Sequence, residues 1–256
     1  MKLSTDKILL STHNEIIKRL PGLSRRYLDI GSGTGELILI IKNSFPVDSY
    51  AIDYTSTLIN IPTQKVDIVN LNKCKLPYDN NSIQAITITE VIEHLENYRC
   101  ILREINRTLE PDGLVVISTP NILNLKSRFR FLFNGFYNLF GPLPTNTTDI
   151  HSANGHITPI SLYYLSHALL ESGFSNIEMS IDKKQKTSIL LLIPMLPFII
   201  IGGFLFKKKE KKKYQTITHS NELYVNLINS VDALCGRTII LSATKKKLHN
   251  LNNHKF

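Results

Sequence analysis

The fold is decided by Tyr27-Leu28-Asp29-Ile30-Gly31-Ser32-Gly33-Thr34-Gly35-Glu36-Leu37. An apolar run, three glycines at alternate positions and a second apolar run follow one another, which predicts a strand, a tight turn and a helix start. Glycine reaches positive φ and lets a ligand approach the backbone, and the free N–H groups of a helix N-terminus lie beside such a turn. The stretch therefore predicts a ligand-binding loop.

The residue after Gly35 excludes two other kinds of glycine loop. A Walker A loop ends in Gly-Lys-Ser or Gly-Lys-Thr, and here Glu36 follows Gly35. The dinucleotide fingerprint requires a third glycine at the position that Glu36 occupies. A carboxylate at the helix start would also repel a pyrophosphate. The loop is therefore predicted to bind an uncharged or cationic ligand.

The segment Asp29–Gly35 resembles motif I of the class I S-adenosylmethionine (SAM)-dependent methyltransferases. Asp53 lies about 20 residues beyond it, at the end of the next predicted strand, where an acid can accept hydrogen bonds from both ribose hydroxyls. The resemblance implies SAM as the cofactor. The cofactor-binding residues that it implies are Asp29, Gly31, Ser32, Gly33, Gly35, Asp53, Tyr54, Asn70, Leu71, Thr89 and Glu90.

The resemblance covers residues 25–121. Leu76–Ser82 is similar to the Leu-Pro-Phe-x-Asp-x-Ser segment of the family, and Glu90–Leu95 matches the Glu-Val-Ile-Glu-His-Leu signature of its ubiquinone-biosynthesis-like, or type 11, branch. Strands and helices alternate from Arg26 to Asn121, which indicates parallel βαβ units. The predicted fold is α/β and Rossmann-like: a mostly parallel seven-stranded sheet with helices on both faces and an antiparallel last strand.

Methyl transfer to a hydroxyl needs a base or a metal, because a protonated hydroxyl is a poor nucleophile. Glu90, Glu93 and His94 follow the fourth predicted strand, and helical spacing would let all three face one point. His156 is a second base candidate, because the branch often has a histidine there. The predicted catalytic residues are Glu93, His94 and His156. The resemblance also suggests Glu90, Glu93 and His94 as Mg²⁺ ligands, although capping and packing roles compete.

The chain divides into one domain with two insertions. Residues 1–187 and 235–245 are predicted to form the SAM-binding domain, and 246–256 a polar tail. A lid-like, aromatic and basic insertion is predicted at 122–155, and an apolar and basic insertion at 188–234. Helices are expected over 5–20, around 95–109 and from Thr158-Pro159, and strands over Phe174–Ile181 and Thr238–Ser242.

The second insertion contains 18 consecutive apolar or small residues, Ile189–Phe206, with basic residues on both sides. The positive-inside rule disfavours a single span, because both flanks favour the same side of a membrane. A proline-bent hairpin in one leaflet or an interfacial anchor satisfies this constraint, with Lys207–Lys213 on anionic headgroups. The alternative is a buried helix pair of a soluble protein.

Composition and sequence motifs limit which cellular compartment and which class of methyl acceptor are expected. The three cysteines show no CxxC pair, so we expect a reducing compartment without a disulfide or zinc site. Asp6 and the absence of a long apolar run near the N-terminus argue against a signal peptide, so the inner face of the cell membrane is expected. Nucleic acid is disfavoured, because Thr89-Glu90-Val91-Ile92 stands where nucleobase enzymes carry an Asn/Asp/Ser-Pro-Pro-aromatic motif.

The net charge of +9 follows partly from the abundance of lysine, with asparagine and isoleucine, that an AT-rich genome produces. The predicted function is O-methylation of a hydroxyl on a lipid-linked glycan or quinone-like acceptor. The alternatives are an RNA or small-molecule methyltransferase and a catalytically silent, SAM-binding membrane adaptor.

Overall fold

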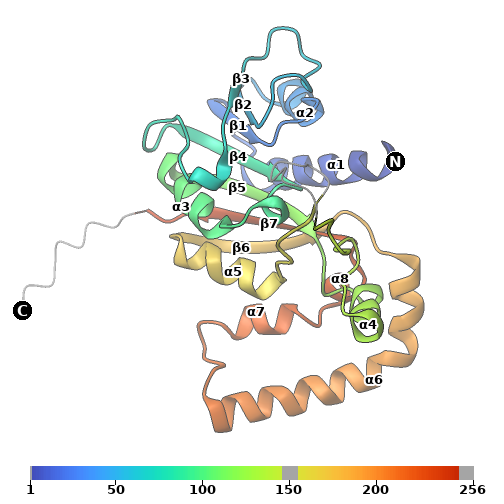
Figure 1. The fold of residues 1–256 in the computed structure, drawn as a ribbon. Coiled ribbons are helices and arrows are strands. Elements are labelled where there is room, and N and C mark those ends of the chain that lie inside the picture. Colours follow the sequence, from blue (N-terminus) through green and yellow to red (C-terminus); the bar gives the residue numbers. More distant parts are fainter. Residues whose placement is uncertain (1, 146–154, 248–256) are drawn as a thin grey trace, which may run out of the picture.

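The structure, a computed structural model, describes residues 2–145 and 155–247. Its centre is a seven-stranded sheet in the order β3-β2-β1-β4-β5-β7-β6, flanked by helices (Figure 1). This arrangement confirms the Rossmann-like α/β prediction. The strands are β1 Arg26–Ile30, β2 Asp48–Asp53, β3 Val66–Ile68, β4 Ile83–Thr89, β5 Leu109–Pro120, β6 Phe174–Ile181 and β7 Thr238–Lys245.

Strands β1 to β5 are parallel, and β7 runs antiparallel to both of its neighbours, β5 and β6. The antiparallel last strand is therefore confirmed. The helices are α1 Lys2–Arg19, α2 Glu36–Ser44, α3 Tyr98–Thr108, α4 Leu125–Asn134, α5 Leu162–Glu171, α6 Lys186–Lys209, α7 Glu222–Leu227 and α8 Val231–Cys235, with short 3₁₀ turns at Leu71–Lys73 and Ile92–His94 and a π-helical end at Glu210–Tyr214.

Alternating side chains of the strands build one core on each face of the sheet. In β4, Ile86 and Ile88 lie in the core covered by α3 and α5, whereas Ala85 lies in the core covered by α1 and α2. The period of two in a strand explains this division. Both cores bury their residues almost completely. The carboxyl edge of the parallel strands is the edge at which open α/β sheets bind ligands.

Helix α5 begins later than the sequence predicts. Its first residue is Leu162, and the side chain of Ser161 caps it by accepting a hydrogen bond from the N–H of Tyr164 at 3.4 Å. The segment before it is not helical, and the N–H groups of Ile157 and Thr158 both donate to the carbonyl of Glu93. The predicted start at Thr158-Pro159 was wrong, because these long-range hydrogen bonds take the place of a first helical turn.

The apolar segment of the second insertion lies in one long helix, α6, rather than in a hairpin. Pro194 and Pro197 lie inside α6, and Figure 1 shows the helix bend without turning back on itself. The helix from Lys186 to Tyr214 is long and apolar enough to cross a membrane, and its most apolar stretch is not buried. The expected hairpin and the alternative of a buried helix pair are therefore both wrong.

A disulfide joins Cys74 to Cys100, which corrects the expectation that no disulfide forms. The two cysteines are 26 positions apart, but their Cα atoms are 5.6 Å apart. The 3₁₀ turn that ends before Cys74 packs against α3, and Cys100 lies in the first turn of that helix. Sequence spacing misses the pair, since packing alone brings it together. Cys235 is buried and free.

Candidate active site

The glycine loop joins β1 to α2, as the sequence predicts. Gly33 has φ +49°, and no atom lies within 4 Å of the position that a Cβ would occupy there. At Gly31, with φ +75°, a Cβ would instead overlap the side chain of Val91. Gly35 immediately precedes α2, also with positive φ. The loop thus packs tightly at Gly31 and leaves open space at Gly33, where a ligand can meet the backbone.

Asp53 lies at the end of β2 and faces this loop. Its Oδ2 accepts a hydrogen bond from the N–H of Gly33 at 2.8 Å, and its Oδ1 accepts one from the N–H of Tyr54 at 2.7 Å. A carboxylate has about four acceptor sites, so two remain for ribose hydroxyls. The carboxylate is nearly buried, whereas the Tyr54 side chain is exposed. The residues present therefore fit the ribose of SAM.

Asp29 supports the loop from beneath. It is buried, and its Oδ1 accepts a hydrogen bond from the Thr87 hydroxyl at 2.7 Å. Burial raises the pKa of Asp29 to about 7. Ser32, at the top of the loop, has a buried hydroxyl with no protein partner. A buried polar atom without a partner calls for an explanation, and a bound ligand or an ordered water is one.

The predicted adenine-side residues lie on the segment after β3. The side chain of Asn70 accepts a hydrogen bond from the N–H of Asn72 and caps the short 3₁₀ turn, so part of its hydrogen-bonding capacity is used locally. Leu71 packs against the core covered by α3 and α5. These contacts place both residues at the carboxyl end of β3, beside the strand that carries Asp53.

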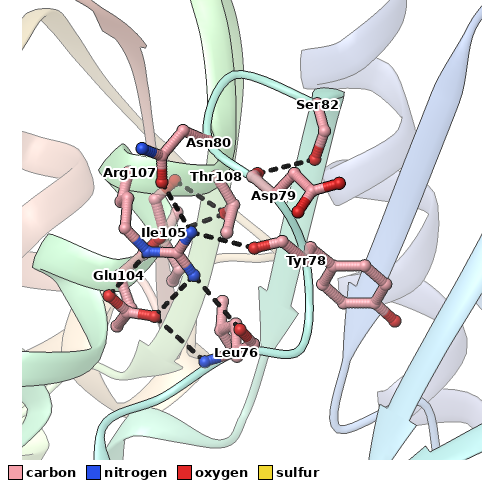
Figure 2. A network of polar contacts seen from close by, with 9 residues as sticks. All are labelled: Leu76, Tyr78, Asp79, Asn80, Ser82, Glu104, Ile105, Arg107 and Thr108. Atoms are coloured by element: carbon pink, nitrogen blue, oxygen red, sulfur yellow. Dashed lines mark hydrogen bonds and ion pairs between the residues drawn. The ribbon is translucent and has the colours of Figure 1, made fainter.

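Arg107 of α3 holds the Leu76–Ser82 motif in place (Figure 2). Its guanidinium donates to the carbonyls of Leu76 and Tyr78 and to the side chain of Asn80, at 2.8–3.1 Å, and also pairs with Glu104. All of these partners lie on the motif or one turn away on α3. Glu104 also accepts a hydrogen bond from the N–H of Leu76 at 3.0 Å, so this arginine and glutamate together fix the motif to α3.

Glu90, directly after β4, has a backbone conformation that the sequence does not predict. It has φ +54°, an uncommon conformation for a residue other than glycine, and its carboxylate accepts a hydrogen bond from the Ser118 hydroxyl at 3.1 Å. Burial raises the pKa of Glu90 to about 7, and Ser118 and Arg237 oppose the shift. The expected helical turn that would align Glu90 with Glu93 does not form. Thr89, just before it, has a buried hydroxyl without a partner.

Glu93, His94 and His156 form the one cluster of potential metal-ligating side chains found among the described residues. One donor atom from each lies within 4.8 Å of the other two. The loop that carries His156 is fixed here because Ile157 and Thr158 donate to the Glu93 carbonyl. The two imidazole rings meet edge to face, with centroids 4.8 Å apart. The structure thus brings together the three predicted catalytic residues, from segments about 60 residues apart.

Burial shifts the pKa of each side chain in this cluster toward its uncharged form. It raises the pKa of Glu93 well above its usual value, and the neighbouring Glu90 adds to the shift. It lowers the pKa of His94, and it lowers that of His156, where His94 contributes as well. Nδ1 of His94 lies 2.9 Å from the carbonyl oxygen of Gly155. A carbonyl only accepts, so Nδ1 carries the proton and Nε2 of the neutral ring has a free lone pair.

The predicted Mg²⁺ site is not assembled. His156 stands where Glu90 was expected, and the resulting donor set is one carboxylate and two imidazoles. Mg²⁺ prefers oxygen ligands, whereas two imidazoles suit zinc or another transition metal. Oε1 of Glu93 and Nδ1 of His156 are buried and have no hydrogen-bond partner. The residues therefore do not fit Mg²⁺.

Several further residues at this edge were not predicted. The Thr119 hydroxyl donates to Oε2 of Glu93 at 3.1 Å, and the buried Phe140 ring packs 5.1 Å from that of His156. Asp182, Arg237 and Thr238 each have a buried polar atom without a partner. The only sequence signal for them was their position at strand ends, which is weak without the strand order.

The open glycine loop, the ribose-facing acid and the polar edge beyond β4 define a class I SAM-dependent methyltransferase. A methyltransferase-domain family matches residues 7–179, more than half of the chain, and the chain belongs to that family. Membership in this family supports SAM-dependent methyl transfer rather than the silent adaptor considered as an alternative.

Known proteins agree with this assignment. A demethylmenaquinone methyltransferase of Geobacillus kaustophilus is 23% identical over 141 residues, which span 50% of this chain and 60% of that protein. An uncharacterized protein of Methanocaldococcus jannaschii is 30% identical over 135 residues, 52% of each chain. A SAM-dependent methyltransferase from Archaeoglobus fulgidus has the same fold, with a TM-score of 0.56 at 16% identity over 92% of this chain and 93% of that one.

Proposed function

We propose that the enzyme methylates a hydroxyl oxygen, with His94 as the general base. The observation that carries this proposal is the hydrogen bond between Nδ1 of His94 and the Gly155 carbonyl, because it leaves a basic Nε2 on a neutral ring. The low pKa of His94 keeps the ring neutral at physiological pH. A base of this kind is what a hydroxyl acceptor needs, since SAM already carries the activated methyl group.

In the proposed reaction, the acceptor oxygen forms a bond to the methyl carbon while the bond from that carbon to the SAM sulfur breaks. The hydroxyl proton passes to Nε2 of His94 and then to solvent. The positive charge therefore moves from the sulfonium to the imidazolium. The carboxyl group of Glu93 lies beside the ring, with a ligand atom within 4.8 Å of one on His94, and Thr119 orients it by a hydrogen bond at 3.1 Å. His156 packs edge to face against His94 and restricts its ring.

The acceptor is proposed to be amphipathic, a lipid-linked glycan or a quinone-like molecule. The Geobacillus relative is named for demethylmenaquinone, which is a quinone, although this chain matches only 60% of that protein. Buried polar atoms of Asp182, Arg237 and Thr238 lie unpartnered at the ends of the neighbouring strands.

The enzyme is proposed to work at the inner face of the cell membrane, with α6 as an interfacial anchor. The two ends of the insertion are paired with each other, because Gln185 donates to the Cys235 carbonyl and Arg237 to that of Lys183. The π-helical end of α6 is followed by α7, which packs on α5. Both ends of the helix are thus held by one folded body, which favours an in-plane anchor over a span. The partner surface is anionic lipid, facing Lys207–Lys213.

The test is methyl transfer from labelled SAM to total membrane lipid, with the wild type compared with His94→Gln. Label is expected in an alkali-stable ether fraction of the lipid, and the variant should lose it. The reaction is repeated with total RNA, and label there instead would favour the RNA alternative. Activity in EDTA is expected to persist. Complete loss in EDTA, with recovery on adding a divalent metal, would replace the general base with a metal-bound acceptor.

Location is tested separately. Deletion of 189–206 should move the protein from the membrane to the soluble fraction, and a tag after Phe256 should stay protected when protease is added outside sealed cells. Digestion of that tag would mean that α6 spans the membrane, which would separate β7 from its sheet. A folded, active deletion variant that still sediments with membranes would overturn the anchor.

A further inference from the structure

Two helices from separate insertions form one exposed apolar surface. Helix α4 comes from the first insertion and α6 from the second, and the two helices are in contact. Leu191, Leu192 and Ile199 of α6 pack against a cluster formed by Leu125 of α4 with Leu234 and Cys235 of α8. The backbone N–H of Lys126 also donates to the Ser188 hydroxyl at 3.3 Å. These contacts fix the position of α4 relative to the helix already assigned to the membrane.

The outward faces of both helices are strongly apolar. On α4, Leu132 and Phe133 are 73% and 78% exposed, and on α6, Ile193 and Phe198 are 73% and 69% exposed. Single exposed apolar residues are common, but this many on two packed helices mark an interaction surface. The other exposed apolar residues of the surface are Phe131, Phe136, Ile189, Leu190, Leu196, Ile200, Ile201, Phe204, Leu205 and Phe206.

A shallow groove connects the two helices. It encloses about 180 Å³ and is lined by Leu125, Arg128, Phe129, Leu132, Met195 and Ile199. The guanidinium of Arg128 donates hydrogen bonds to the backbone carbonyls of Leu123 and Ile228. The groove is therefore almost entirely apolar on its open side, so it interrupts the surface without introducing a free charge.

Charge identifies the partner as anionic lipid. Lysines 207–209 and 211–213 follow the apolar part of α6 directly, and Lys208 and Lys212 make no ion pair within the described residues. Lys126, on the first turn of α4, is exposed too. An apolar face bordered by lysines is the pattern of elements that lie in the bilayer interface. A protein partner would not require a basic border of this length.

We infer that α4 and α6 together form one docking surface for an anionic lipid bilayer, so that α4 is a membrane-binding element and not only a lid. This inference rests on the proposed membrane location of α6 and extends it. Both helices leave the sheet at its carboxyl edge, α4 after β5 and α6 after β6. Docking through both would therefore hold the Glu93, His94 and His156 cluster close to the bilayer, where an amphipathic acceptor presents its hydroxyl.

The experiment is flotation of the full-length protein with vesicles of phosphatidylcholine, with and without about one third phosphatidylglycerol. The wild type should float with the anionic vesicles. The double variant Leu132→Asp/Phe133→Asp should lower its partition coefficient by about tenfold or more, because two exposed apolar side chains no longer enter the interface. Leu10→Asp is the matched control, since Leu10 is 51% exposed on α1, away from the surface, and should leave flotation unchanged.

Other occupants give different results. If the wild type floats and the double variant floats equally, α4 does not contact the bilayer, while the anchor role of α6 stands. If sedimentation without lipid shows a dimer that the double variant dissociates, and flotation is unchanged, the surface binds a second copy and the inference fails. Far-UV circular dichroism confirms that the variant folds. Methyl transfer to a soluble acceptor, measured in parallel, separates these outcomes from failure of the proposed chemistry.

Discussion

The two halves of the carboxyl edge are built in different ways. The cofactor half comes from one continuous stretch, with the glycine loop and Asp53 only 20 residues apart and joined directly by the Gly33–Asp53 hydrogen bond. The acceptor half gathers Glu93, Thr119 and His156 from three separate segments. A local motif fixes the first half, whereas strand order and long-range hydrogen bonds fix the second. Variants in the first half should alter SAM binding, and variants in the second should alter turnover.

The largest effect is expected from His94→Gln. Loss of a general base lowers turnover by about 10²- to 10⁴-fold, and SAM affinity should remain that of the wild type. Single-turnover kinetics and calorimetry measure the two quantities. His167→Gln is the matched control, since that histidine is exposed on α5 and should leave both unchanged. If His156→Gln abolishes turnover and His94→Gln does not, the two histidines exchange roles.

Gly33→Val should weaken SAM binding by about 100-fold or more. A β-branched residue at φ +49° is strained, and its side chain would fill the open space over the loop. Calorimetric titration with SAM measures the loss. Gly135→Val is the control for strain alone, because Gly135 has φ +74° and open space around it but ends α4. Equal losses of SAM affinity in both variants would locate the cofactor elsewhere.

Asp53→Ala should weaken SAM binding by about 10- to 100-fold, the loss expected for hydrogen bonds to one charged group. The variant also removes the acceptor for the N–H groups of Gly33 and Tyr54, so the loop loses part of its support. Asp53→Asn keeps one acceptor oxygen and should lie between the wild type and the alanine variant. If the alanine variant binds SAM with wild-type affinity, Asp53 does not bind the ribose.

The smallest effect is a shift in pH dependence. Burial lowers the pKa of His94 below its ordinary value of 6.5, so the base stays neutral into the mildly acidic range. Activity should fall as pH drops through this lowered pKa, when His94 becomes protonated. The acid limb of kcat/KM, measured with a soluble acceptor, should therefore have its midpoint below 6.5. A midpoint above that value would mean that a different group limits the rate.

The parts of the structure that sequence predicts are those set by local spacing. The glycine turn, the position of Asp53 at the end of β2 and the β6 bounds follow from motif order and period, and the structure confirms them. Glu90 was misplaced, because its positive φ and a 3₁₀ turn replace the expected α-helix after β4. The Cys74–Cys100 disulfide was missed since only the packing of a turn on α3 creates it. The continuation of α6 through Pro194 was also missed, because proline disfavours the interior of a helix and the sequence therefore predicted a bent hairpin.

The position of β7 has a consequence for how the chain is made. Among the described strands, β6 pairs only with β7, yet β7 is synthesised after the whole α6 insertion. The nascent chain therefore leaves the ribosome with β6 unpaired and the apolar helix exposed before residues 238–245 can close the sheet. A free strand edge and an uncovered apolar helix at the same moment favour aggregation in water. If α6 binds a lipid surface early, its apolar side chains are no longer exposed to water, and only the unpaired edge of β6 remains. The chain would then attach to the membrane before β7 completes the sheet.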